Sequence, residues 1–175
     1  MKTKKILVPL ATLAAGAAIA IGSGATFTST TANTISSVTS GTLTHTNSKD
    51  GKAILTLKDI KPGDVVNGSV VITNTGSLPA DFSLTETSST NGFTDPNLTL
   101  TITDTTTNTK IYSGNFGGLA DGTKNALGSF PAGAAHTYVF SVKLADDAPN
   151  SQQNKTATAA YQWDSVQQAA TTTNQ

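Results

Sequence analysis

The sequence contains no cysteine and no arginine, and these two absences exclude several kinds of site. Its 175 residues include eleven lysines, ten aspartates and a single glutamate, Glu86. Without cysteine the chain has no disulfide framework, no thiolate nucleophile and no thiolate metal ligand. Without arginine it lacks the planar fork that recognises phosphate and carboxylate groups through paired hydrogen bonds. We therefore expect a fold that is held together by its apolar core and its backbone hydrogen bonds alone.

Residues that carry catalysis or metal binding are also scarce. The chain has two histidines, His45 and His136, and no H-E-x-x-H or other pattern with the spacing of a metal site. It has no G-x-S-x-G nucleophile motif. A Ser-His-Asp triad assembles in space and stays open, but we expect both histidines to lie on the surface of strands. The sequence predicts no catalytic, cofactor-binding or metal-binding residue and no enzymatic activity.

Paired acidic residues occur in two predicted loops. Asp59 and Asp64 flank a Pro-Gly turn signal, and Asp146 is followed by Asp147. Two loop carboxylates are able to chelate calcium, but the D-x-D-x-D-G spacing of a calcium loop is absent. We expect solvated loop acids, with weak calcium binding as the alternative. No cluster of basic residues lies beyond the N-terminus, which argues against nucleic-acid binding.

Residues 1–25 have the three parts of a secretory signal. Three lysines come first, an apolar stretch rich in alanine runs to Gly22, and Ser23 and Ala25 occupy the −3 and −1 positions of a cleavage site. A spanning helix needs about 20 predominantly apolar residues, and this stretch is shorter. We expect cleavage before Thr26 and a secreted bacterial protein with no stable membrane insertion. A permanent N-terminal anchor is the alternative.

Threonine is the most frequent residue in the whole sequence. The 32 threonines, together with many valines and isoleucines, favour strands because β-branched side chains suit a pleated surface. Apolar and polar residues alternate most cleanly at 98–103, where Leu98, Leu100 and Ile102 share one face. The pattern predicts an all-β domain over residues 41–166, a two-sheet antiparallel sandwich of jelly-roll or immunoglobulin-like type with about eight strands. The predicted strands cover residues 41–46, 53–57, 65–74, 80–87, 98–103, 111–113, 136–144 and 157–166.

The sequence also predicts the loops of the domain, the core residues of its last strand and the segments at its two ends. Residues 114–133 are predicted to form a loop, and a short helix is an alternative for residues 146–153. The Asn67-Gly68 pair indicates either a hairpin turn or a β-bulge. Tyr161 and Trp163 are expected to share the core face of the last strand. Outside the sandwich, we expect an extended segment over residues 26–40 and a mobile polar tail over residues 167–175.

An ordered set of short motifs resembles one family of secreted bacterial proteins, the TasA/camelysin family. The motifs are GATFT at 24–28, TSGTL at 39–43, IKPGD at 60–64, VITNTG at 71–76, LTLTITD at 98–104, IYSG at 111–114 and YQWD at 161–164. This resemblance implies a jelly-roll sandwich that polymerises into extracellular matrix and biofilm fibres. It also implies a signal peptide that is cut by a dedicated signal peptidase of the SipW type. Some members carry a metallopeptidase label.

The function implied by this resemblance is that of a self-assembling structural subunit. In such fibres an N-terminal strand of one subunit completes the sheet of the next. Here the donor strand would be residues 26–40, with Phe27, Ile35 and Val38 as candidate subunit contacts. The expected partners are other copies of this chain and, during export, a signal peptidase; no cofactor is expected. A monomeric surface adhesion or ligand-binding module and a camelysin-like metalloendopeptidase remain alternatives.

Overall fold

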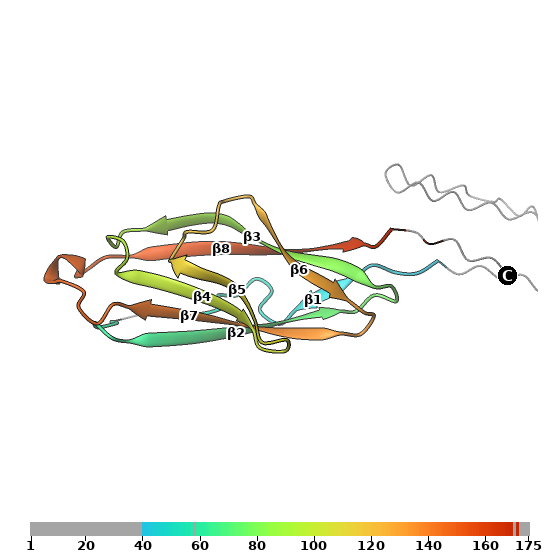
Figure 1. Ribbon diagram of the computed structural model, residues 1–175, viewed down its shortest axis with the longest axis horizontal. Coiled ribbons are helices and arrows are strands. Elements are labelled where there is room, and N and C mark those ends of the chain that lie inside the picture. Colours follow the sequence, from blue (N-terminus) through green and yellow to red (C-terminus); the bar gives the residue numbers. More distant parts are fainter. Residues whose placement is uncertain (1–39, 58, 170, 172–175) are drawn as a thin grey trace, which may run out of the picture. The chain divides into compact units, whose positions relative to one another are not determined.

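A computed structural model describes residues 40–57, 59–169 and 171. In this part of the chain, eight strands form two antiparallel sheets that face each other (Figure 1). The strands are β1 (His45–Asn47), β2 (Val65–Asn74), β3 (Ala80–Asn91), β4 (Leu98–Asp104), β5 (Thr109–Asn115), β6 (Lys124–Phe130), β7 (Ala135–Leu144) and β8 (Ala157–Gln167). The predicted all-β antiparallel sandwich is confirmed. The same residues include no helix that is long and apolar enough to cross a membrane.

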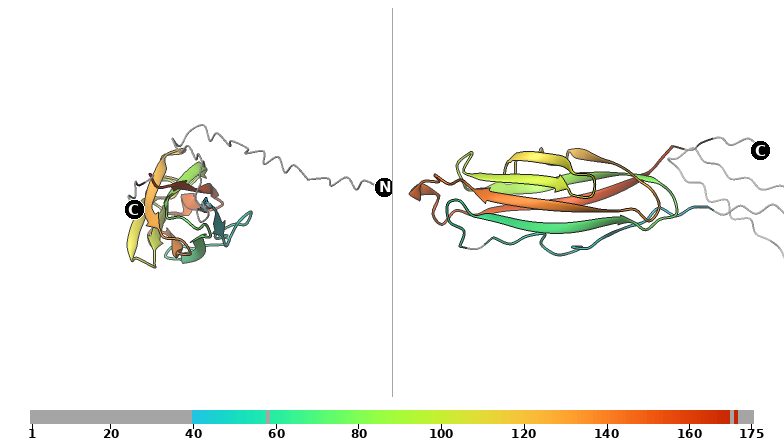
Figure 2. Two further views of the ribbon diagram at one scale, coloured as in Figure 1. Left: turned by 90° about the vertical axis from the view of Figure 1, so that its right-hand side faces the viewer. Right: turned by 60° about the horizontal axis from the view of Figure 1, so that its bottom comes forward.

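The two sheets are unequal in size. One sheet has five strands in the order β1-β2-β7-β4-β5, and the other has three in the order β6-β3-β8. The long strands β3 and β8 pair from Ala80↔Gln167 to Asn91↔Ala157. Both layers are visible in the two views of Figure 2. Among the described residues no strand pairs with both sheets, so the two sheets are not joined into a closed barrel.

The alternation read from the sequence places the core between the sheets. Strand β4 buries Leu98, Leu100 and Ile102, which confirms that these three share an inner face. Burial of apolar area of this kind contributes about 25 cal/mol per Å² and is the main favourable term of folding. The buried apolar side chains are Val70, Ile72, Ala80, Phe82, Leu84, Leu98, Leu100, Ile102, Phe116, Leu119, Phe130, Tyr138, Phe140, Val142, Leu144 and Trp163.

Asn74 fixes one end of the sandwich. Its side chain is fully buried, and its amide nitrogen donates hydrogen bonds to the carbonyl oxygens of Leu78 (2.9 Å), Phe130 (2.9 Å) and Pro131 (3.2 Å). Its side-chain oxygen accepts a hydrogen bond from the Gly76 backbone at 3.0 Å. This single side chain therefore joins the end of β2 to the turn after it and to the connection between β6 and β7.

Two strand predictions near the N-terminal side of the sandwich are wrong. Residues 53–57 alternate like a strand but form no ladder, and the first strand is reduced to His45–Asn47. Neither a turn nor a bulge occurs at Asn67-Gly68, because β2 runs through this pair in unbroken register with β7. Residues 53–57 form no ladder because residues 54 and 55 pack onto Gly68, as described below.

The loop predicted over residues 114–133 is also partly wrong, because it contains β6. The signal for this strand is weak, since Gly128 has a positive φ of 97° and interrupts the alternation before the buried Phe130. The pairing with β3 also shifts here, because the consecutive residues Phe82 and Ser83 pair with Gly128 and Ala126 and leave Leu127 of β6 as an extra residue. The helix considered for residues 146–153 is reduced to one 3₁₀ turn, η1 (Asn150–Gln152).

Trp163 allows the core assignment of β8 to be tested. Its side chain is only 7% exposed, and its ring lies 4.8 Å from that of Tyr138. We expect Trp163→Ala to lower the free energy of unfolding by about 3–5 kcal/mol, because truncation removes apolar burial and leaves a cavity. Urea denaturation followed by circular dichroism measures this loss. Red-shifted, freely quenched tryptophan emission from the folded wild-type protein would contradict the assignment.

Candidate functional site

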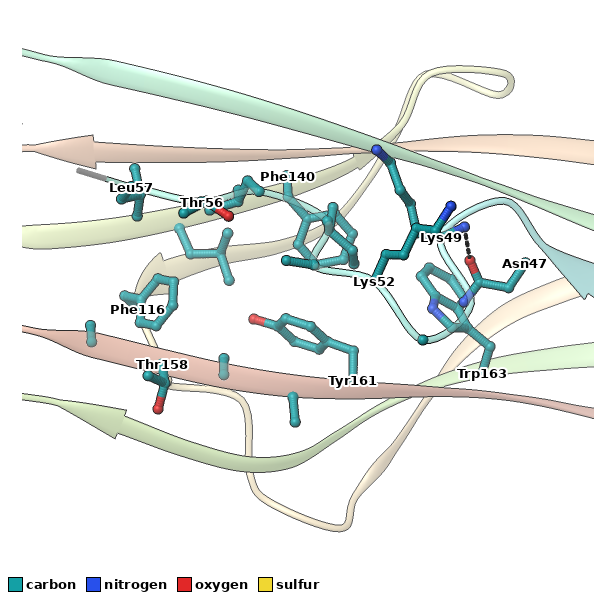
Figure 3. A pocket seen from close by; sticks show the side chains of 18 of the residues that line it. Asn47, Lys49, Lys52, Thr56, Leu57, Phe116, Phe140, Thr158, Tyr161 and Trp163 are labelled. Atoms are coloured by element: carbon teal, nitrogen blue, oxygen red, sulfur yellow. Dashed lines mark hydrogen bonds between the residues drawn. The ribbon is translucent and has the colours of Figure 1, made fainter.

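A cleft of about 550 Å³ lies between β8 and the chain that connects β1 to β2. We call residues 48–57 of this connection the strap. The walls of the cleft include Leu100, Phe116, Phe140 and Tyr161, and Figure 3 shows the Tyr161 ring projecting from β8 into this space. Apolar and aromatic side chains thus line one side of the cleft, and charged residues of the strap, Lys49 and Lys52 among them, line the other.

The residues of β8 explain why this space is not filled. Ala157, Ala159, Tyr161 and Trp163 alternate along the face of β8 that lines the cleft. The two alanines are too small to reach the opposite sheet, so the cleft remains beside the N-terminal half of the strand. In the described part of the chain β8 pairs with β3 alone. The cleft therefore adjoins a sheet edge whose backbone groups have no ladder partner.

The strap closes the cleft on the side of β2. It can approach β2 closely because Gly68 stands at an inward-facing position of that strand, between Val66 and Val70. A Cβ atom on Gly68 would collide with the carbonyl oxygen of Ile54 and would lie 2.7 Å from the Cβ atom of Leu55. The absence of a side chain at this position thus lets the strap backbone pass where a core side chain would otherwise sit.

Glu86 is a buried acidic residue next to the cleft, on the strand that pairs with β8. It lies opposite Tyr161 in the β3–β8 register, beside a bulge, and its side chain is fully inaccessible. Burial raises its pKa; the nearby hydroxyls of Ser89 and Tyr161 offset part of this effect, and the charge of Asp121 adds to it. Neither carboxyl oxygen reaches hydrogen-bonding geometry with a described residue, and the Tyr161 hydroxyl is likewise buried without a partner. Burial without a charged partner thus favours the neutral form of this carboxyl more than in the unfolded chain.

The two histidines are held in a row of aromatic rings away from the cleft. The ring centroids follow one another as His45–Phe82 (5.6 Å), Phe82–Phe130 (4.2 Å) and Phe130–His136 (3.8 Å). His136 is not a surface residue as predicted: its side chain is 14% exposed, and its Nδ1 lies 2.7 Å from Oδ2 of Asp104. The prediction failed because the alternation at the start of β7 does not show that Phe130 covers this ring.

Asp104 forms the other half of this pair. Burial alone would raise its pKa, but hydrogen bonds from His136, Thr107 and the backbone N–H groups of Thr106 and Thr107 together hold the pKa below its ordinary range. His45 makes a separate hydrogen bond to Ser165, with Nδ1 2.9 Å from Oγ. Each histidine therefore has its own structural partner, and two phenylalanine rings separate them.

These positions do not fit a catalytic metal. A catalytic zinc takes three protein ligands, and the described residues contain no group of three histidine, cysteine or acidic side chains that could hold one. The predicted loop acids lie on the surface instead. Asp146 is exposed and paired with Lys143 at 2.6 Å, and Asp64 lies 4.0 Å from Lys61. Asp59 is also exposed.

The candidate subunit contacts Phe27, Ile35 and Val38 lie outside the described residues, so they remain predictions. The cleft and the buried Glu86 were not predicted. A signal for Glu86 existed, because the chain's single glutamate continues the inward alternation of Phe82 and Leu84. No sequence signal indicates the cleft, since it arises where two distant segments fail to fill the space between the sheets.

Comparison with known proteins gives one result. The model of the camelysin metallo-endopeptidase family matches residues 2–99, which include the predicted signal, the strap and the first three strands. No curated protein matches the chain.

The buried carboxyl of Glu86 makes the stability of the protein depend on pH. Because its pKa is raised above the ordinary 4.5 in the folded state, the unfolded chain loses its proton first as the pH rises. The contribution to stability is then full below the unfolded-state pKa and is lost as the pH rises through the folded-state pKa. We expect Glu86→Gln, a neutral isostere, to be more stable than the wild type at about pH 8 and similar at about pH 4.

Urea denaturation at both pH values measures this difference. The matched control is Asp81→Asn, because Asp81 is exposed on the same strand. A gap between wild type and Glu86→Gln that is equally large at both pH values would show that ionisation of Glu86 is not its cause.

Proposed function

The chain belongs to the camelysin metallo-endopeptidase family, and from this premise we propose that it is a secreted structural subunit that assembles into extracellular matrix fibres. In the proposed assembly, residues 26–40 of one subunit add as a strand to β8 of the next. The protein leaves the bacterial cell through cleavage of its signal peptide, and its partners are other copies of itself. Signal peptidase acts on it only during export.

The single observation that supports this proposal best is the cleft beside the free edge of β8. A strand edge offers a row of backbone N–H and C=O groups for pairing, and neighbouring apolar space receives alternate side chains of the added strand. Strands β1, β5 and β6 are also outermost in their sheets. Neither β5 nor β6 lines the described cleft, and the three-residue β1 contributes only Asn47, whereas β8 lines it along Ala157–Trp163.

The composition of residues 26–40 suits them to this role. The segment is rich in threonine and serine and contains neither proline nor a charged residue. Proline would remove a ladder donor, and a charge would be costly in an apolar cleft. Phe27, Ile35 and Val38 supply the apolar side chains that such a cleft receives. Cleavage after Ala25 would release this segment from the membrane, so that export and assembly are coupled.

The cleft is also a specific observation in favour of a second function, a monomeric adhesion or ligand-binding module. Pockets of about 300–1,000 Å³ with apolar walls are the usual size of small-molecule sites. A monomer that binds an apolar ligand and never polymerises would have this second function. The fibre proposal is preferred because it also accounts for the unpaired edge of β8 and for the composition of residues 26–40.

A metallo-endopeptidase activity finds no support in the described residues. The aromatic row separates the two histidines, and His136 is already engaged by Asp104 at 2.7 Å. We therefore propose that the family name does not describe the reaction of this chain.

Truncation tests the fibre proposal directly. A chain that begins at Gly41 should stay folded, as judged by Trp163 fluorescence, but should form no fibres in electron microscopy at concentrations where the chain from Thr26 polymerises. The reason is that the donor strand has been removed while the acceptor cleft is intact. A point variant tests the same idea without shortening the chain: Ile35→Ser in the chain from Thr26 should weaken assembly without affecting the fold.

The alternatives give different results in the same experiment. If the shorter chain forms fibres as readily as the longer one, donor-strand addition is wrong. If the shorter chain unfolds, residues 26–40 belong to the sandwich of their own subunit.

Proteolysis of casein tests the peptidase alternative. The purified protein should leave casein intact, with or without added zinc, because its histidines do not converge on one site. Cleavage that is stopped by a chelator and lost in His45→Ala or His136→Ala would contradict this expectation and support the family name.

A further inference from the structure

We propose that residues 53–57 of the strap are a removable plug, which covers the acceptor site in the isolated subunit and moves off it when another subunit adds its strand. This inference rests on the proposed function, since it concerns regulation of the same cleft. The evidence for the plug is how residues 53–57 contact the rest of the domain.

The plug is held by side chains and not by its backbone. Ile54, Leu55 and Leu57 pack against the buried core. No backbone N–H or C=O group of residues 53–57 forms a hydrogen bond with any described residue. The sequence of this segment would suit a strand, yet it makes no ladder with β2 or β8. Removal of the plug therefore breaks no backbone hydrogen bond to the described part of the chain.

The chain on both sides of the plug is better fixed. Before it, Ser48 and Val71 exchange two hydrogen bonds, from Ser48 N–H to Val71 O at 3.0 Å and from Val71 N–H to Ser48 Oγ at 2.8 Å. After it, Gly63 N–H donates to Leu144 O at 3.0 Å. The plug thus moves between two anchored points, and its displacement leaves the β2–β7 ladder intact.

Gly68 sets how deeply the plug sits. Since a Cβ atom there would collide with the Ile54 carbonyl, any larger residue lifts the plug away from β2. A plug seated this way covers apolar surface in the monomer. An incoming strand would cover the same surface and would also satisfy the free edge of β8, which the plug leaves unpaired. The exchange therefore gains backbone hydrogen bonds at little loss of apolar burial.

Because the chain contains no cysteine, a single introduced thiol reports the position of the plug. Leu55→Cys places it at the contact with Gly68, and the control Ser69→Cys places it at an exposed position of β2. In monomers we expect Cys at position 55 to react with a thiol reagent about tenfold more slowly than Cys at position 69, because it reacts only when the strap opens locally. In assembled fibres this difference should disappear.

A second variant tests the plug without a label. Gly68→Ala should shorten the lag before fibre growth, as measured by light scattering, whereas Ser69→Ala should leave it unchanged. Fibres in which position 55 stays as protected as in the monomer would overturn the plug while leaving the fibre proposal intact. An unchanged lag for Gly68→Ala would also overturn it. If the wild-type protein forms no fibres at any concentration, the proposed function fails first and the plug fails with it.

Discussion

The hydrogen-bonding requirement of the backbone along the free edge of β8 is the constraint on which the other features of the site depend. β8 pairs with β3 from Ala157 to Gln167, and no described strand pairs with its other side. Water can satisfy these groups only where they are exposed, and the cleft beside them has apolar side chains in its walls. A further strand would satisfy them completely. The strap covers the neighbouring apolar surface but provides no such ladder.

Three local features maintain this arrangement. Gly68 lets the strap lie against the inner face of β2, the alanines of β8 leave the cleft unfilled, and Glu86 places a buried carboxyl behind Tyr161. Each is unfavourable for the stability of an isolated domain, since it weakens packing or leaves polar groups without partners. Proteins often keep such features at sites that change state. Their concentration on one side of the sandwich is consistent with a surface that is completed by another subunit.

The regular part of this fold could be predicted from the sequence, because alternation directly reports which side of a strand is buried. Leu98, Leu100 and Ile102 are the clearest case, and their whole inner face is buried as expected. Prediction failed where tertiary contacts override local pattern. Residues 53–57 have the pattern of a strand, but the lack of a side chain at Gly68 allows them to pack against β2 in a position without a ladder partner. β6 was missed because Gly128 interrupts its alternation with a positive φ.

The candidate site was harder to predict than the fold for the same reason. The cleft, the edge of β8 and the environment of His136 each depend on segments that are far apart in the sequence. Phe130, for example, stacks on His136 at 3.8 Å and covers a histidine that the sequence placed on the surface, so that its side chain is mostly buried. Assembly was expected from the family resemblance and from the composition of residues 26–40, and neither of these indicates where on the sandwich a strand would bind.

Hydrogen exchange along β8 tests the central claim most directly. In the monomer, the amide groups on the free edge of Ala157–Trp163 should exchange rapidly because they lack ladder partners. In fibres the same amides should become strongly protected, while the amides on the outer edges of β5 and β6 keep their monomer rates. Protection that appears on β5 or β6 and leaves β8 unchanged would contradict the account.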